Sequence, residues 1–153
     1  DLLGYSGHCY RMLNYIYLLG MREEDMALLE IALPFHDLGI WTEKTMDYLE
    51  PSFNEAKAYV LKEELEVDLG HLKLLIMEHH KVNPISNSSL AEHFRKADLI
   101  DLSFGLIRFG ISRKDLKQIR RTIPYYRFQI SVLRKVLAYA LTHLRRPFPM
   151  MRK

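Results

Sequence analysis

Apolar side chains recur along this chain at spacings of three and four residues, which is the pattern of amphipathic helices. His8, Met12 and Ile16 share one face of a helix expected over 5–19, and Gly20 is expected to end it. The same criteria predict six further helices, over about 22–37, 52–66, 68–80, 89–103, 112–124 and 125–144. No strand-like alternation of apolar and polar residues is sustained over five positions. The sequence therefore predicts an all-α, single-domain bundle of six to seven helices.

Polar residues suited to helix capping precede several of these segments. The expected capping residues are Ser52, Asp68, Ser89 and Ser112. Ser52 and Ser89 are each followed three residues later by a glutamate, which completes a capping box. Pro34 lies inside the second predicted helix and should kink it, and Gly39 should end that helix.

The composition is that of a globular domain. The 153 residues are 48% hydrophobic, enough for a sizeable core, and no apolar run approaches the roughly 20 residues of a membrane span. The single cysteine, Cys9, excludes an intrachain disulfide and fits a reducing compartment, so we expect a cytoplasmic protein. The chain begins at Asp1 rather than at a methionine, which leaves open a targeting segment ahead of it.

The formal net charge of +3 conceals a strong asymmetry. Residues 1–103 hold nine Lys/Arg and 18 Asp/Glu, whereas residues 104–153 hold 13 Lys/Arg and a single acid, Asp115. Such polarity indicates that the C-terminal third faces something acidic. Phosphate groups, nucleic acid, a membrane surface and the acidic half of the same chain all fit this description.

Ionisable side chains lie on the apolar faces of four predicted helices. They are His8, His36, Asp37, His79, His80 and Asp98. The pair His36-Asp37 ends the apolar stretch "ALPFHDLGIWT". Any one of these residues fits a hydrogen-bonded position in the core, but a buried charge without a partner costs several kcal/mol. A central metal ion would satisfy all of them together, because it compensates carboxylates and binds neutral imidazole.

The order and spacing of these residues resemble those of the HD-domain superfamily, the His…His-Asp…Asp metal-dependent phosphohydrolases. The segments that carry the resemblance are "FHDLGI", "EHH" and "KADLID", within about residues 5–105. The resemblance implies an HD-domain-like bundle in which a divalent metal is ligated by His8, His36, Asp37 and Asp98. It favours Asp98 over Asp101 because Asp98 directly follows Ala97, as in the family's pattern.

The resemblance also implies a possible second metal, because many members hold two ions bridged by the aspartate of the His-Asp pair. His79 or His80 matches one of the further histidines. His71 lies eight residues before His79, roughly 12 Å along one helix at about 1.5 Å per residue, so we expect a surface or structural role for it. Mixed His/Asp ligation does not distinguish Mn, Fe, Ni, Co, Mg and Zn, although the lack of cysteine argues against structural zinc.

The function implied by the resemblance is hydrolysis of a nucleotide or other small phosphoester by a metal-activated water. Asp37 and Lys81 are the expected catalytic residues, and Arg11 and Lys81 are the expected cations for the phosphate. Trp41, Thr42 and Tyr48 follow the His-Asp pair and could line a substrate pocket. The alternative, which we prefer, is a loop and short turn packed by Trp41 and Tyr48. Two other functions stay open: a di-iron oxygenase on the same ligands, and a non-catalytic metal-containing binding or scaffold domain.

The basic C-terminal helices, expected within 112–144, lie outside the resemblance. Lys114, Lys117 and Arg121 form a basic stripe at helical spacing, and Tyr125 and Tyr126 follow it. Basic and aromatic residues together are typical of nucleic-acid binding. A solvated helix face that docks on the acidic half explains the same pattern, and we favour it over a nucleic-acid partner.

Overall fold

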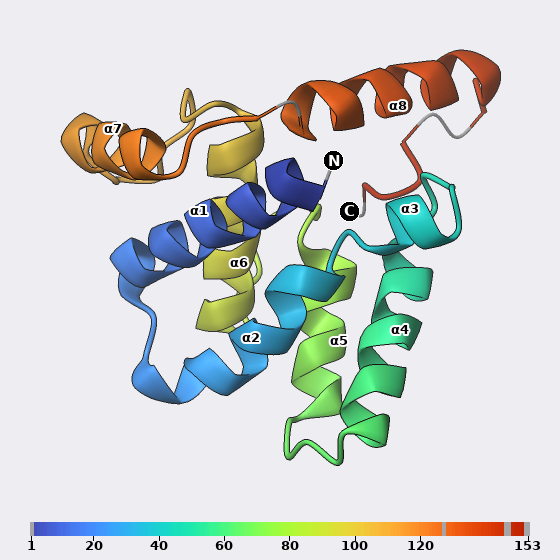
Figure 1. The fold of residues 1–153 in the computed structure, drawn as a ribbon, viewed down its shortest axis with the longest axis horizontal. Helices are drawn as coiled ribbons and strands as arrows, with labels where there is room; N and C mark the ends of the chain where they lie inside the picture. Colours follow the sequence, from blue (N-terminus) through green and yellow to red (C-terminus); the bar gives the residue numbers. More distant parts are fainter. Residues whose placement is uncertain (1, 127, 146–147, 152–153) are drawn as a thin grey trace.

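The computed structural model describes residues 2–126, 128–145 and 148–151 (Figure 1). In chain order the elements are α1 (Leu2–Gly20), a 3₁₀ helix η1 (Glu23–Asp25), α2 (Met26–Phe35), α3 (Gly39–Thr42), α4 (Leu49–Lys62), α5 (Leu69–Glu78), α6 (Ser89–Leu102), α7 (Arg113–Thr122) and α8 (Phe128–Thr142). The described residues contain no strand, and seven of these helices have ten residues or more. The predicted all-α bundle is confirmed.

Helices α1 and α6 pack along each other at the centre of the bundle. The helices α2, α4 and α5 lie below them in Figure 1, and α7 and α8 lie along the upper edge. Met12 and Ile16 of α1 are fully buried with Phe94 and Ala97 of α6. The predicted face of the first helix is thus the face that builds the core.

Two of the predicted helix caps are confirmed. The Asp68 carboxylate accepts hydrogen bonds from the backbone N–H groups of Gly70 and His71, at 2.8 and 3.0 Å, and so caps α5. The Ser112 hydroxyl caps α7 by accepting the N–H of Asp115 at 3.1 Å. Both residues satisfy backbone donors that the first helical turn leaves unpaired.

The other two caps are placed differently. The cap of α6 is Ser88 rather than Ser89: its hydroxyl accepts the N–H of Ala91 at 3.1 Å. Ser52 lies inside α4, which begins at Leu49. The Ser-x-x-Glu pattern located both helix starts only approximately. In α6 the preceding serine is the cap, and α4 begins three residues before Ser52.

Gly39 does not end a helix, contrary to the prediction. His36, which follows α2, and Leu38, which precedes α3, both have helical dihedrals, and Gly39 begins α3. A Cβ on Gly39 would lie 2.7 Å from the carbonyl oxygen of Tyr48 and 3.1 Å from the backbone nitrogen of Ser52. The N–H of Gly39 also donates to the Ser52 hydroxyl at 2.9 Å. This glycine therefore lets the start of α4 approach the His-Asp segment closely.

Pro34 lies inside α2, which ends one residue later at Phe35. Its carbonyl oxygen accepts a hydrogen bond from the hydroxyl of Tyr5 on α1 at 3.0 Å. The end of α2 is thereby held against α1 at the point where the His-Asp pair follows.

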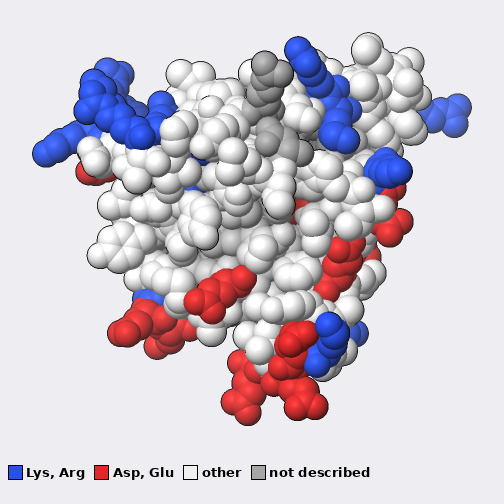
Figure 2. All heavy atoms as spheres, in the orientation of Figure 1, with Lys and Arg blue, Asp and Glu red and all other residues white. Residues whose placement is uncertain are grey.

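The charge asymmetry of the sequence is also a spatial one. Figure 2 shows Lys and Arg gathered over α7 and α8 at the upper edge, and Asp and Glu over the lower part of the bundle and along its right side. Among the described residues, the ion pairs within 4.0 Å all join residues of the first 101 positions. None of the described helices is both long enough and apolar enough to span a membrane.

Candidate metal centre

The six ionisable residues singled out in the sequence meet inside the bundle. They come from α1 (His8), the turn after α2 (His36 and Asp37), the end of α5 (His79 and His80) and α6 (Asp98). Five of them are at most 3% exposed, and the side chain of the sixth, His80, is 17% exposed. Residues 90 positions apart in sequence thus share one enclosed site.

The first group of possible ligands lies where α1, α6 and the His-Asp turn meet. The Nε2 atoms of His8 and His36 are 3.2 Å apart. His8 Nε2 is 3.5 Å from Oδ1 of Asp98, and His36 Nε2 is 3.5 Å from Oδ2 of Asp37. His8, His36 and Asp37 each offer an atom close enough to the others to hold one metal ion.

A second group shares Asp37 with the first. Its Oδ1 lies 3.4 Å from Nε2 of His79, and Asp37, His79 and His80 could together hold a metal ion. His80 also approaches Asp98, with Nδ1 3.3 Å from Oδ2. The sequence proposed His79 or His80 for a second ion, and the structure brings both to the shared carboxylate.

The outer nitrogens of the histidines are already engaged. Nδ1 of His36 lies 2.7 Å from the carbonyl oxygen of Leu33, and Nδ1 of His79 lies 2.8 Å from that of Ile76. A carbonyl oxygen can only accept, so both Nδ1 atoms carry the proton. In the neutral rings Nε2 is then a lone pair that points to the centre, as in a metal-binding histidine.

Several inward-facing atoms have no hydrogen-bond partner. These are Oδ1 of Asp37, Nε2 of His79 and Oδ1 of Asp98, and all three are buried. Leaving one such atom unpaired costs about 1–3 kcal/mol, and a charged atom costs more. Because all three are electron-pair donors, a cation between them would satisfy them together. The residues present therefore fit a metal ion.

Asp101 lies behind His8 rather than in the centre. Its carboxylate accepts from His8 Nδ1 at 2.8 Å, from Arg11 through Nε at 2.7 Å and Nη2 at 2.8 Å, and from Gln129 at 2.7 Å. This bonding orients the His8 ring and leaves its Nε2 facing Asp98. The two aspartates of "KADLID" thus have different tasks, with Asp98 at the centre and Asp101 as support.

Arg11 is not placed as the phosphate-binding cation that the sequence suggested. It is fully buried and pairs with Asp101, and its Nη1 donates to the carbonyl oxygen of Pro124 at 3.0 Å. The Arg11 guanidinium also lies over the ring of Tyr125 in a cation–π contact, with its central carbon 4.2 Å from the ring centroid. The guanidinium therefore neutralises the buried carboxylate of Asp101 and is not exposed to bind a phosphate.

The pKa values of the buried groups follow from these contacts. Burial lowers the pKa of His36 to about 3, which keeps its imidazole neutral. Burial, with Asp37 and Asp101 nearby, raises the pKa of Asp98 to about 7. Burial alone would raise the pKa of Asp101 too, but hydrogen bonds from Arg11 and His8 lower it to about 2. The carboxylate of Asp101 is thus paired with the guanidinium of Arg11, whereas no Lys or Arg among the described residues pairs with Asp98.

A cavity of about 350 Å³ opens beside the centre. Its polar lining includes Tyr48, His79, His80, Lys81, Arg95 and Asp98. Its apolar lining is Met46, Val82, Leu99, Leu102, Val132, Val136, Met150 and Met151. The predicted Lys81 is therefore at the cavity, with Nζ 3.2 Å from Oε2 of Glu78. The hydroxyl of Tyr48 lies 2.7 Å from Nε2 of His80 and holds that ring at the cavity wall.

Trp41 and Thr42 are not part of this lining. The Trp41 ring packs between Tyr5 and Phe128, at centroid distances of 5.0 and 5.9 Å. The Thr42 hydroxyl donates to the carboxylate of Glu55 on the surface. The placement of Trp41 agrees with the packed turn that was the alternative interpretation of this segment, and Thr42 lies away from the cavity.

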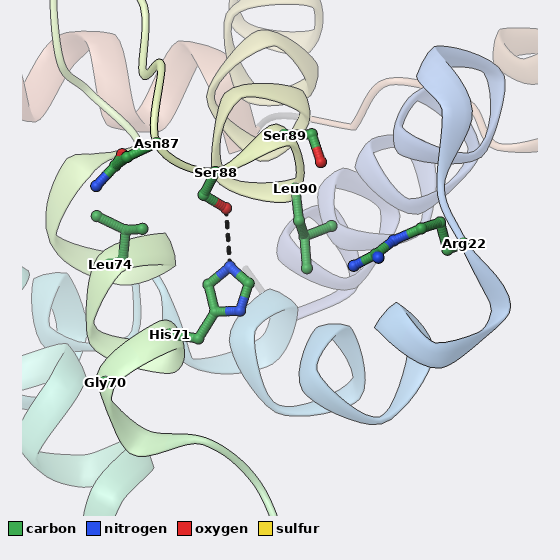
Figure 3. Close-up of a pocket in the computed structure, with 8 residues that line it drawn as sticks. All are labelled: Arg22, Gly70, His71, Leu74, Asn87, Ser88, Ser89 and Leu90. Carbon is green, nitrogen blue, oxygen red and sulfur yellow. Dashed lines mark hydrogen bonds between the residues drawn. The ribbon is translucent and has the colours of Figure 1, made fainter.

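His71 lies in a separate hollow, of about 450 Å³, between the start of α5 and the start of α6 (Figure 3). Its Nε2 is 2.8 Å from the hydroxyl of Ser88, and Arg22 and Asn87 also line this hollow. None of the six residues of the candidate metal centre lines this hollow. This placement agrees with the structural role expected for His71.

Sequence reasoning missed the partners that hold the centre in place. Asp101 was considered only as a ligand, Tyr48 only as a residue that could line a pocket, and Gln129 was not connected with the site. Asp101 follows Asp98 by one helical turn on the same face, which was a usable signal. No signal linked Tyr48 to His80 or Gln129 to Asp101, because these contacts arise from the packing of distant segments.

The chain matches no protein-family model, and it matches neither a curated protein nor a solved structure.

Proposed function

We propose that this protein is a metal-dependent phosphohydrolase that acts on a nucleotide or another small phosphoester. One observation carries the proposal: beside an open cavity, buried electron-pair donors of Asp37, His79 and Asp98 have no hydrogen-bond partner. The resemblance of the His…His-Asp…Asp pattern to the HD-domain superfamily supports the same conclusion.

His8, His36, Asp37 and Asp98 would hold one divalent ion, and Asp37, His79 and His80 would hold a second. Such an ion supplies a water of lowered pKa and neutralises the charge of phosphoryl oxygens. The hydrogen bonds from Nδ1 of His36 and His79 to backbone carbonyls fix both rings with Nε2 inward. Asp101 does the same for His8.

The cavity lining supports a substrate with one anionic end. Lys81 places a cation beside His80, where it would contact a phosphate that lies against the centre. Arg95, also at the cavity, is held by Glu92 through Nε and Nη2, each at 2.8 Å. The apolar side chains of α6 and α8 would contact the organic part of the phosphoester and exclude water from it.

An open cavity favours an enzyme over a purely structural metal site, since a structural ion needs no access for a substrate. The carboxylate of Asp37 lies between both ligand groups, which favours two ions. Two ions are also what the di-iron oxygenase alternative requires, so metal content and reaction type have to be measured together.

The test is metal analysis of protein purified without added metal, followed by a phosphatase and nucleotidase screen with Mn²⁺. We expect bound transition metal and hydrolysis of at least one phosphoester. Asp37→Asn should lose both, whereas Asp47→Asn, an exposed aspartate outside the centre, should keep both. Two irons per chain with an O₂-dependent activity would replace hydrolysis by oxygenation, and full metal occupancy without any turnover would indicate a scaffold.

A further inference from the structure

The outer face of α8 is apolar and uncovered. Ile130, Leu133, Leu137 and Leu141 are spaced three, four and four residues apart, which places them on one side of the helix. Each is between 49% and 76% exposed. The opposite side of α8 holds buried Phe128 and the side chains of Val136 and Tyr139, which pack on the core. One apolar face of α8 is buried in the protein and the other is exposed, and an exposed apolar face of this kind marks an interaction site.

A second apolar protrusion follows α6. In the turns between α6 and α7, Phe104, Leu106, Ile107 and Phe109 are exposed, and Leu106 is the most exposed of them at 86%. These turns lie at the same upper edge of the molecule as α7 and α8 (Figure 1). Isolated exposed apolar residues are ordinary, but two groups at one edge are not.

Cations surround these apolar groups. A hollow of about 600 Å³ lies between the 104–108 turn and α7. Its charged lining residues are Arg108, Arg113, Lys117, Arg120 and Arg121, and the lining contains no acidic residue. On α8, Arg134 follows Leu133 directly and is exposed. Figure 2 shows this basic edge opposite the acidic lower end of the bundle.

We propose that the edge formed by α7, α8 and the 104–110 turns binds the surface of an anionic lipid membrane. In this arrangement the outer leucines and isoleucine of α8, with Leu106, enter the boundary between headgroups and acyl chains. The guanidinium and ammonium groups of α7 lie at the level of the lipid phosphates. The acidic end of the bundle points away from the membrane, so repulsion from it is smallest.

Charge and side-chain chemistry favour this occupant over two others. A second copy of the chain would bring two strongly basic edges together, and their like charges would oppose association. A nucleic acid would match the cations and could stack on the exposed rings of Phe104 and Phe109, but it would leave the leucine and isoleucine stripe of α8 uncovered. An anionic membrane matches the cations and the aliphatic stripe together. The proposal does not depend on the metal centre or on its reaction.

The test is co-sedimentation of the full chain with two kinds of vesicle, phosphatidylcholine alone and phosphatidylcholine mixed with phosphatidylserine. We expect binding only to the mixed vesicles and release at high salt, because screening weakens contacts with lipid phosphate. Lys117→Gln and Arg121→Gln should each reduce the partition coefficient about fivefold. Leu133→Gln and Leu137→Gln should each reduce it by roughly fivefold or more.

Matched controls come from α4, on the acidic side of the molecule. Leu61 is 61% exposed and Lys62 is also exposed, so Leu61→Gln and Lys62→Gln repeat the two kinds of change outside the proposed surface. Both should leave vesicle binding unchanged. Circular dichroism and the melting temperature of each variant establish that the fold is retained.

Three results would overturn the proposal. The first is no binding of the unaltered chain to the mixed vesicles, and the second is binding that the α8 variants leave unchanged. The third is a different occupant: a dimer in sedimentation velocity that Leu137→Gln dissociates, or tight binding of single-stranded RNA with no binding to vesicles.

Discussion

The Nε2 atoms of His8 and His36 lie 3.2 Å apart, in a site where neither side chain is exposed. Each ring donates its Nδ1 proton outward, to Asp101 and to the carbonyl oxygen of Leu33 respectively. In the neutral rings, two lone pairs therefore face each other. A proton or a metal ion bound by both nitrogens would remove this repulsion, and the nearby carboxylates of Asp37 and Asp98 favour a metal.

Divalent metal should therefore stabilise the fold. We expect Mn²⁺ or Zn²⁺ to raise the melting temperature of chelator-treated protein, because an ion that binds only the folded state adds about 2.7 kcal/mol at 100 times its Kd. Differential scanning fluorimetry measures the shift. His36→Asn should abolish it, and His71→Asn, in the separate hollow, should keep it. An equal shift in both variants would mean that the ion binds elsewhere.

Asp101 should control metal affinity without binding the metal. Asp101→Asn removes the charged acceptor that orients His8, and such partners of a ligating histidine are worth about 10–100-fold in metal affinity. Isothermal titration with Mn²⁺ gives the affinity, and circular dichroism reports whether the fold survives the loss of the Arg11 partner. Asp47→Asn is the matched control and should leave the affinity unchanged. An unchanged affinity in Asp101→Asn would contradict the orienting role.

Gly39 should resist replacement on steric grounds. In Gly39→Ala the new Cβ would meet the Tyr48 carbonyl oxygen, a backbone atom that cannot rotate away. We expect a loss of about 1–3 kcal/mol in the free energy of unfolding, measured in urea. Gly70→Ala, whose Cβ would approach only a side-chain oxygen of Asp68, should change it by less than about 1 kcal/mol. Similar losses in both variants would mean that close packing at Gly39 is not the cause.

The Glu92–Arg95 pair predicts a pH-dependent contribution to stability. Burial alone would raise the pKa of Glu92, but hydrogen bonds from Arg95 and from the N–H of Ile85 lower it to about 2. An unfolded glutamate titrates near about 4.3, so the stabilisation is complete above that pH and is lost as the pH falls towards 2. The stability difference between wild type and Glu92→Gln should thus shrink between pH 5 and pH 2. Urea unfolding across this range measures it, and a difference that stays constant from pH 5 to pH 2 would contradict this contribution.

The sequence by itself determined the helices and the candidate metal ligands. Helical spacing of apolar residues is a local property, so the faces that carry His8, Met12 and Ile16 could be predicted without knowing what they pack against. A buried ionisable group is costly, and this made the histidines and aspartates on those faces conspicuous before any contact was known. The charge asymmetry between the two parts of the chain was visible in the same way.

Only the tertiary structure decided what each of these groups does. Arg11 looked like a free cation in the sequence, but α1 packs against α6 and delivers it to Asp101, 90 residues away. Gly39 looked like a helix end, but the approach of α4 makes it a packing position. Both outcomes depend on contacts between distant segments, whose geometry follows from the packing of whole helices and not from local sequence. The same packing brings His79 and His80 together at Asp37, and it leaves the outer face of α8 bare.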